Sequence, residues 1–254
     1  MKKLFSILLC LALAGNALGQ GIGSRIADTD FAIELGDSPF SLQPVSYLHF
    51  GFNLTFNAPD LLKDNSSFFK SQQFGFNIIE LSCRPYSSGS FSIGADVEWN
   101  WYHLNSDYMF NPYSDIETVP SPNGNKVSIQ PKTIMGITEV RRSILSVCTF
   151  EFPFNFTQMM GRAYFNIGAS AELNIPGCVQ FKGKKGTDSI DEMKGGTHYS
   201  NKITTNQFTY NVHAAIGYGG LGIYAKYRPK PVFKDGYGPQ FQTLTIGLIM
   251  GLGF

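Results

Sequence analysis

The stretch Arg162-Ala-Tyr-Phe-Asn-Ile-Gly-Ala-Ser-Ala-Glu-Leu-Asn-Ile175 alternates apolar and polar side chains along its length. Successive side chains of a β-strand point to opposite faces of the sheet, so this segment would form a strand with one apolar and one polar face. Ala163, Phe165 and Ile167 begin the apolar face. The segment is longer than the five or so residues common in soluble sheets and covers the roughly nine to eleven that a tilted membrane-crossing strand needs.

Seven further segments alternate in a similar way. Five are regular, namely 47–56, 91–102, 208–218, 221–228 and 244–254, and two, 74–84 and 144–156, each contain a phase slip that predicts a β-bulge. Their polar faces are rich in Gly, Ser, Asn and Tyr with single charges of both signs, whereas the wet face of a soluble sandwich is richer in Lys, Glu and Thr. A cramped barrel interior, in which charges must pair, explains this composition better. We therefore expect an all-β protein, a closed antiparallel transmembrane β-barrel of about eight strands.

The connections between these segments alternate between long and short. The long ones are 57–73, 103–143, 176–207 and 229–242, and the short ones are 85–90, 157–161 and 219–220. Outer-membrane barrels have short periplasmic turns and long external loops, so the pattern places both chain ends in the periplasm. One alternative stays open. Residues 31–35 also alternate, and pairing with the segment around Val127 would give ten strands and room for a narrow channel.

The overall composition agrees with strands that have one apolar face. Aromatic residues make up 14% of the 254 residues and charged residues 15%, the net charge is +1, and the mean hydropathy is −0.06. Disorder would need few aromatics, a helical membrane bundle would need long apolar runs, and a nucleic-acid partner would favour a basic chain. Four residues at strand ends are expected to be interfacial aromatics: Trp99, Trp101, Tyr218 and Tyr227.

The N-terminus has the pattern of a cleaved export signal. Met1-Lys-Lys3 is basic, an apolar stretch follows as far as Ala14, and Ala17-Leu-Gly19 supplies small residues for cleavage. We expect residues 1–19 to be the signal peptide, 20–44 an N-terminal periplasmic segment and 45–254 the barrel. The expected location is the outer membrane.

Three segments resemble a family of small bacterial outer-membrane β-barrel proteins that includes the PorT-like proteins. The segments are 224–239, Phe150-Glu-Phe-Pro-Phe154 and the C-terminal strand 244–254. The last resembles the signal that the barrel-assembly machinery recognises, and the residues that would carry it are Leu248, Met250, Leu252 and Phe254. The resemblance implies a barrel fold and an outer-membrane location, and it supplies no catalytic motif.

Two motifs suggest other activities. Gly217-Tyr-Gly-Gly-Leu-Gly222 has the spacing of a dinucleotide-binding loop, but strand-like residues follow it instead of a helix, so a tight hairpin is expected. His198-Tyr-Ser200 resembles the His/Ser spacing of barrel enzymes that deacylate lipid A, but it lies in a polar loop. The histidines and cysteines show no metal-ligand spacing. We expect no catalytic residues, no cofactor and no metal.

Charged residues give two more candidate sites. Five inward-facing residues are expected to form an internal ion-pair network, because a charge in a low-dielectric interior is costly unless it is paired: Asp96, Glu98, Arg162, Glu172 and Lys226. Lys182, Lys184 and Lys185 lie in the third long loop. They are solvated there or contact lipid phosphates at the outer surface.

These observations favour a non-enzymatic barrel whose lumen is filled by side chains, with a structural or surface-interaction role through its external loops. The expected partners are outer-membrane lipids and the barrel-assembly machinery, with no nucleic acid, and the protein is expected to be a monomer. An accessory role in protein secretion or envelope assembly is the alternative that the PorT-like resemblance implies. A lipid-modifying barrel enzyme is the third possibility.

Overall fold

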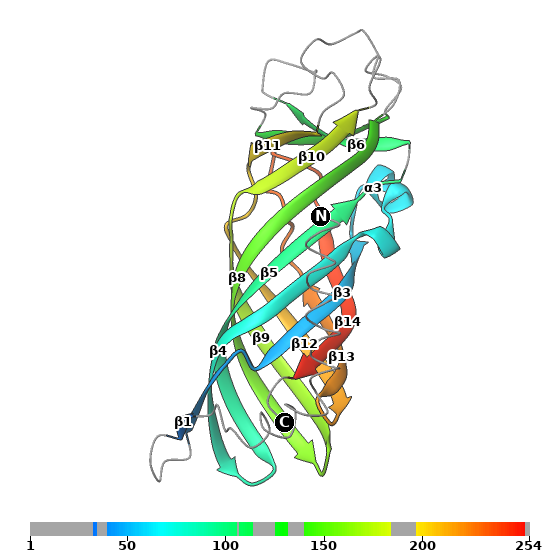
Figure 1. Ribbon diagram of the computed structural model, residues 1–254. Coiled ribbons are helices and arrows are strands. Elements are labelled where there is room, and N and C mark those ends of the chain that lie inside the picture. Colours follow the sequence, from blue (N-terminus) through cyan, green and yellow to red (C-terminus); the bar gives the residue numbers. More distant parts are fainter. Residues whose placement is uncertain are drawn as a thin grey trace.

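A closed ring of long antiparallel strands forms the body of the protein (Figure 1). The structure, a computed structural model, describes residues 33–34, 40–105, 107–113, 125–131, 140–183 and 197–251. The ring strands are β3 (Tyr47–Phe56), β4 (Gln72–Tyr86), β5 (Gly89–His103), β8 (Val140–Met160), β9 (Ala163–Asn174), β12 (Phe208–Tyr218), β13 (Leu221–Arg228) and β14 (Gln242–Gly251). The ring closes where β14 pairs with β3 along ten residues of each strand. The all-β fold and the closed barrel of eight strands are thereby confirmed.

Shorter elements lie outside the ring. They are β1 (Ile33–Glu34), β2 (Phe40–Pro44), β6 (Tyr108–Tyr113), β7 (Lys126–Pro131), β10 (Gly177–Gly183), β11 (Thr197–Ile203), helix α3 (Asp60–Asn65) and the 3-10 turn η1 (Phe68–Lys70). Since β1 pairs with β2 and β7 pairs with β6, the ten-stranded alternative is wrong. Strand β2 pairs with β4 and lengthens the barrel sheet. Residues 40–44 therefore continue the sheet beyond the ring.

The two ends of the barrel differ in their connections. Two-residue turns at 87–88, 161–162 and 219–220 join strands at one end, here called the turn end. The opposite end, here called the loop end, carries α3, β6, β7, β10 and β11 (Figure 1). The glycines of the G-x-G-x-x-G motif form one of the tight turns, in which Gly219 and Gly220 have φ of 55° and 88°. The expected hairpin is thus confirmed. Among the described residues, no helix is long and apolar enough to cross a membrane.

One of the two expected bulges is present. The pairing of β4 with β5 shifts register between Asn77 and Ile79. In contrast, β8 keeps one register with β9 from Thr149 to Met160, and one register with β5, so the bulge expected within 144–156 is wrong. The alternation of apolar and polar residues changes phase there because Leu145 and Val147 are apolar and yet face the inside of the barrel, where they are buried.

Side chains alternate between the lumen and the outer surface. Burial alternates residue by residue along β9 and along β12. The outward positions of the ring carry exposed apolar side chains, of which Ile93, Phe154, Ile216, Ile223 and Leu248 are each more than half exposed. The barrel therefore has an apolar outer belt around a largely polar interior.

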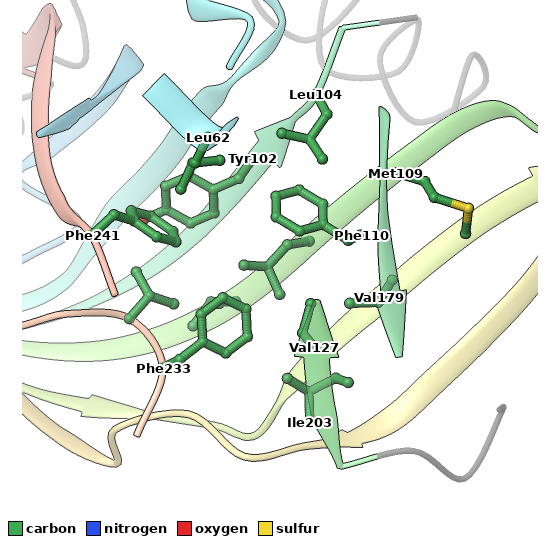
Figure 2. Packing of buried hydrophobic residues seen from close by; sticks show 13 residues of the cluster. Leu62, Tyr102, Leu104, Met109, Phe110, Val127, Val179, Ile203, Phe233 and Phe241 are labelled. Atoms are coloured by element: carbon green, nitrogen blue, oxygen red, sulfur yellow. The ribbon is translucent and has the colours of Figure 1, made fainter. Parts of the chain in front are cut away.

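An apolar cluster blocks the lumen at the loop end (Figure 2). It combines side chains of ring strands with side chains of the four long connections: Leu62, Tyr102, Leu104, Met109, Phe110, Val127, Leu145, Val147, Val179, Ile203, Val232, Phe233 and Phe241. We call this cluster the cap. Phe110 and Phe233 are fully buried, and the Phe233 and Phe241 rings meet edge to face with centroids 6.1 Å apart. Hydrophobic burial therefore holds the long connections together across the mouth of the barrel.

Candidate functional site

Two cations and three carboxylates meet in the middle of the lumen. Lys226, on β13, donates from Nζ to Glu98 Oε2 and to Glu151 Oε2, each at 2.6 Å. The three side chains are almost completely buried, on strands β13, β5 and β8. Charges in such an interior are stable only when they are paired and hydrogen-bonded. The lysine therefore joins strands that lie apart around the ring.

Arg228 forms the second half of this network. Its Nε donates to Glu172 Oε2 at 2.6 Å, and its Nη2 donates to Glu172 Oε1 at 2.7 Å and to Glu98 Oε1 at 3.1 Å. The two bonds to Glu172 make the bidentate fork that favours arginine at buried carboxylates. Asn211 completes the link by donating from Nδ2 to Glu151 Oε1 at 2.9 Å and to Glu172 Oε1 at 2.7 Å.

Neutral polar side chains extend the network to the remaining ring strands. Asn100 donates to Glu98 Oε1 at 2.6 Å, Asn53 donates to Asn100 Oδ1 at 3.2 Å, and Thr245 donates to Asn53 Oδ1 at 2.6 Å. Tyr224 donates to Gln73 Oε1 at 2.6 Å. With these contacts every one of the eight ring strands contributes a side chain. The middle of the barrel is therefore filled by a connected polar layer.

The predicted network is partly right in its membership. Glu98, Glu172 and Lys226 meet as described, while Asp96 lies in the lumen and accepts hydrogen bonds from Tyr47 Oη at 2.5 Å and Asn77 Nδ2 at 2.7 Å. Arg162, the fifth residue expected in this network, does not join it. It is an exposed residue of the 161–162 turn, one position before β9 begins, so its side chain does not enter the lumen.

Sequence reasoning missed Glu151 and Arg228. Arg228 has the same inward phase as Lys226 on β13, which was a usable signal, but it is the last residue of the strand. Glu151 was obscured by the apparent phase slip in β8. The motif Phe150-Glu-Phe-Pro-Phe154 was a signal that could have identified it, because Glu151 lies there between the apolar residues Phe150 and Phe152.

Carboxylate oxygens of Glu98, Glu151 and Glu172 lie within 4.8 Å of one another, close enough to surround a metal ion. The head groups of Lys226 and Arg228 already occupy this position, at 2.6 Å from carboxylate oxygens. A divalent ion would have to displace two buried cations. The arrangement therefore suits a structural role better than metal binding.

A cavity of about 410 Å³ occupies the lumen between this network and the turn end. Lys226, Glu151 and Asp96 line it on the network side, and Ser88 and Gly161 line it at two of the turns. The lumen is thus closed by the cap and open as a cavity at the turn end. The expectation of a lumen filled by side chains is therefore wrong at the turn end, where this cavity lies.

Two histidines line the cavity, and each lies over a glycine of the neighbouring strand. His49 pairs with Gly75 and His213 pairs with Gly168 across their ladders. A Cβ atom at either glycine would come within 2.5 Å of the histidine Nε2, so the rings fit only because the glycines lack side chains. His213 contacts Asn155 Oδ1 and Asn211 Oδ1. His49 Nε2 is buried and makes no hydrogen bond, although Glu98 Oε2 lies 3.5 Å away.

The other predicted residues lie on the outer surface or outside the described part of the chain. Trp99 and Trp101 face outward on β5, and Tyr218 and Tyr227 lie at opposite ends of the outer surface. Of the assembly-signal residues, Leu248 and Met250 are exposed on β14, and Leu252 and Phe254 lie outside the described residues. Lys182, His198 and Ser200 lie on β10 and β11, whereas Lys184 and Lys185 are not described. The cysteines Cys83, Cys148 and Cys178 are free.

No protein-family model matches the chain, and no curated protein sequence matches it either. Among solved structures, 29 chains show similarity. One solved structure, described as "Asymmetric conductivity of engineered proteins", is 8% identical and has a TM-score of 0.20, with 84% of this chain and 100% of that chain covered. Similarity at this level carries no argument about function, so the architecture rests on the strand pairing itself.

Proposed function

We propose that the protein is a non-enzymatic outer-membrane β-barrel that acts through its external loops, in a structural or surface-interaction role. The observation that carries this proposal is the apolar outer belt, with side chains such as Ile216 and Leu248 exposed around a polar interior. An exposed apolar surface of this extent needs a lipid partner, because soluble proteins rarely expose large contiguous apolar patches. A barrel is also one of the two structures that satisfy every backbone polar group in lipid.

The cap supports the loop-based role. The long connections are tied to one another by backbone hydrogen bonds, such as Val127 N–H to Tyr237 O at 2.9 Å and Asn206 N–H to Val232 O at 2.9 Å. Asn206 Nδ2 also donates to the carbonyls of Pro231 and Phe233, both at 2.8 Å. Loops held on a rigid scaffold are where binding usually resides. The cap thus provides a firm base for a contact surface.

An epitope insertion tests the location and the orientation together. An epitope placed after Gly236, an exposed residue with φ of 77° at the loop end, is expected to be labelled by antibody on intact cells. The matched control carries the same epitope at 87–88, at the turn end, and is expected to be labelled only after the outer membrane is permeabilised. Labelling of both on intact cells, or recovery of the protein in a soluble fraction, would contradict the proposal.

The same proposal predicts that the barrel does not conduct. Because the cap and the polar layer fill the lumen from the loop end to its middle, purified protein in planar bilayers should show no stable openings. Stable large openings would contradict this. A deletion strain tests the role itself: loss of secreted cargo would favour the accessory role, and an altered lipid A mass would favour a lipid-modifying enzyme.

A further inference from the structure

We propose that the turn-end cavity is a binding site for a small organic cation that carries a primary ammonium group. The cavity, about 410 Å³, is lined by residues of several ring strands and reaches the turns at Ser88 and Gly161. Pockets of roughly 300–1,000 Å³ are typical of small-molecule sites. Within the part of the chain that the structure describes, the cavity is open toward the turn end and the cap closes the loop end, so it is a blind pocket.

The charge around the cavity is negative. Asp96, Glu151 and Lys226 are buried and line the cavity. Three more buried charged residues lie behind this wall, namely Glu98, Glu172 and Arg228, so that four carboxylates face two cations. Glu80 and Arg84 also line the cavity and add one charge of each sign. Asp96 and Glu151 are directly opposite on β5 and β8, a position in which like charges repel, and Lys226 Nζ lies 2.6 Å from Glu151 Oε2. A low-dielectric cavity with this excess attracts cations.

His49 points independently to a ligand. Its side chain is 5% exposed and lines the cavity, and its Nε2 makes no hydrogen bond among the described residues, with Glu98 Oε2 lying 3.5 Å away. A buried polar atom without a partner costs about 1–3 kcal/mol. An ammonium group has three donors. With the His49 ring proton on Nδ1, the ammonium group can supply one donor to His49 Nε2 and others to the oxygens of Asp96, whose two protein partners leave lone pairs unused.

The aromatic wall favours an organic cation. Tyr47 and Tyr224 flank His49, with ring centroids 6.1 Å and 5.5 Å from it, and both tyrosines line the cavity. Ammonium groups are attracted to aromatic faces within about 6 Å. A metal ion fits less well. Among the described residues, the carboxylates close enough to share an ion are Glu98, Glu151 and Glu172, and Lys226 and Arg228 already occupy that position.

Calorimetric titration of the full-length protein, folded in detergent, tests the site with 1,4-diaminobutane as the probe. Butanedioate, which has the same chain length and opposite charge, and Zn²⁺ are titrated in parallel. We expect 1,4-diaminobutane to bind and butanedioate not to bind. Asp96→Asn, which keeps the side-chain shape, should weaken binding about tenfold or more, equivalent to ~1.4 kcal/mol.

Two further variants serve as controls. Asp60→Asn removes an exposed carboxylate at the loop end and should leave binding unchanged. Ser90→Phe fills the cavity near the turns without touching Asp96, and should abolish binding even if Asp96→Asn does not fold. The proposal is overturned if 1,4-diaminobutane gives no binding heat, if it binds Ser90→Phe as tightly as the native protein, or if butanedioate or Zn²⁺ binds in its place. None of these outcomes bears on membrane location, so the site and the proposed function fail separately.

Discussion

Replacing Arg228 with alanine should destabilise the barrel strongly. The side chain makes three short hydrogen bonds to the buried carboxylates of Glu172 and Glu98, at 2.6, 2.7 and 3.1 Å. Hydrogen bonds to charged groups contribute roughly 1.5–3 kcal/mol each, and removing one partner of a buried ion pair costs about 3–5 kcal/mol. Because Glu172 would keep its charge with no cation in contact, we expect the free energy of unfolding to fall by about 3–5 kcal/mol.

Urea titration in detergent or lipid vesicles measures this loss, with Trp99 and Trp101 as fluorescent reporters on the outer surface. Arg162→Ala is the matched control, since Arg162 lies exposed in a turn. Its effect should stay within about 0.5 kcal/mol. Adding Glu172→Gln to Arg228→Ala should recover part of the stability, because it removes the unpaired charge. An Arg228→Ala protein that unfolds within about 1 kcal/mol of the native protein would refute the reasoning.

Three further changes have expected outcomes. Gly75→Ala should destabilise the barrel by about 1–3 kcal/mol in the same urea assay, because a Cβ would lie 2.2 Å from His49 Nε2, and His49→Ala should relieve much of that loss. Phe110→Ala should cost about 3–5 kcal/mol through the cavity it leaves in the cap, and full native stability would mean that the cap does not pack as described. Deleting Phe254 should lower the yield of assembled barrel in cell membranes, and normal surface levels would argue against the terminal signal.

Strand positions were predictable wherever the lumen face is polar. The predicted bounds of β3, β12 and β13 coincide with the structure to the residue. Each of these strands faces the cavity or the ion network, so apolar and polar side chains alternate cleanly. In β8 the inward residues change from Leu145 and Val147 at the cap to Glu151 at the network. The inward face of β8 therefore changes from apolar to polar along the strand, which looks like a phase shift in the sequence although the strand keeps its register.

The membership of the site was harder to predict than the strands. Alternation identifies an inward residue only if the strand ends are known, and the predicted segment 162–175 began one residue before β9, which placed Arg162 inside. Arg228 lay within the predicted bounds of β13 and in its inward phase, but it was not assigned to the network. The cap was not predictable, because the loop residues that form it lack a periodic pattern. Their contacts, such as that between Phe233 and Phe241 and the ring strands, depend on closure of the whole ring.

The cap also constrains the order of folding. Its members extend from Leu62 to Phe241, almost the full length of the barrel sequence, and Phe241 directly precedes β14, the strand that closes the ring on β3. Contacts between residues so distant along the chain form slowly, because the loop between them must first be closed. We therefore expect the apolar side chains of the four connections to pack together only after most of the ring strands have paired. A refolding experiment should accordingly show strand formation before burial of the cap.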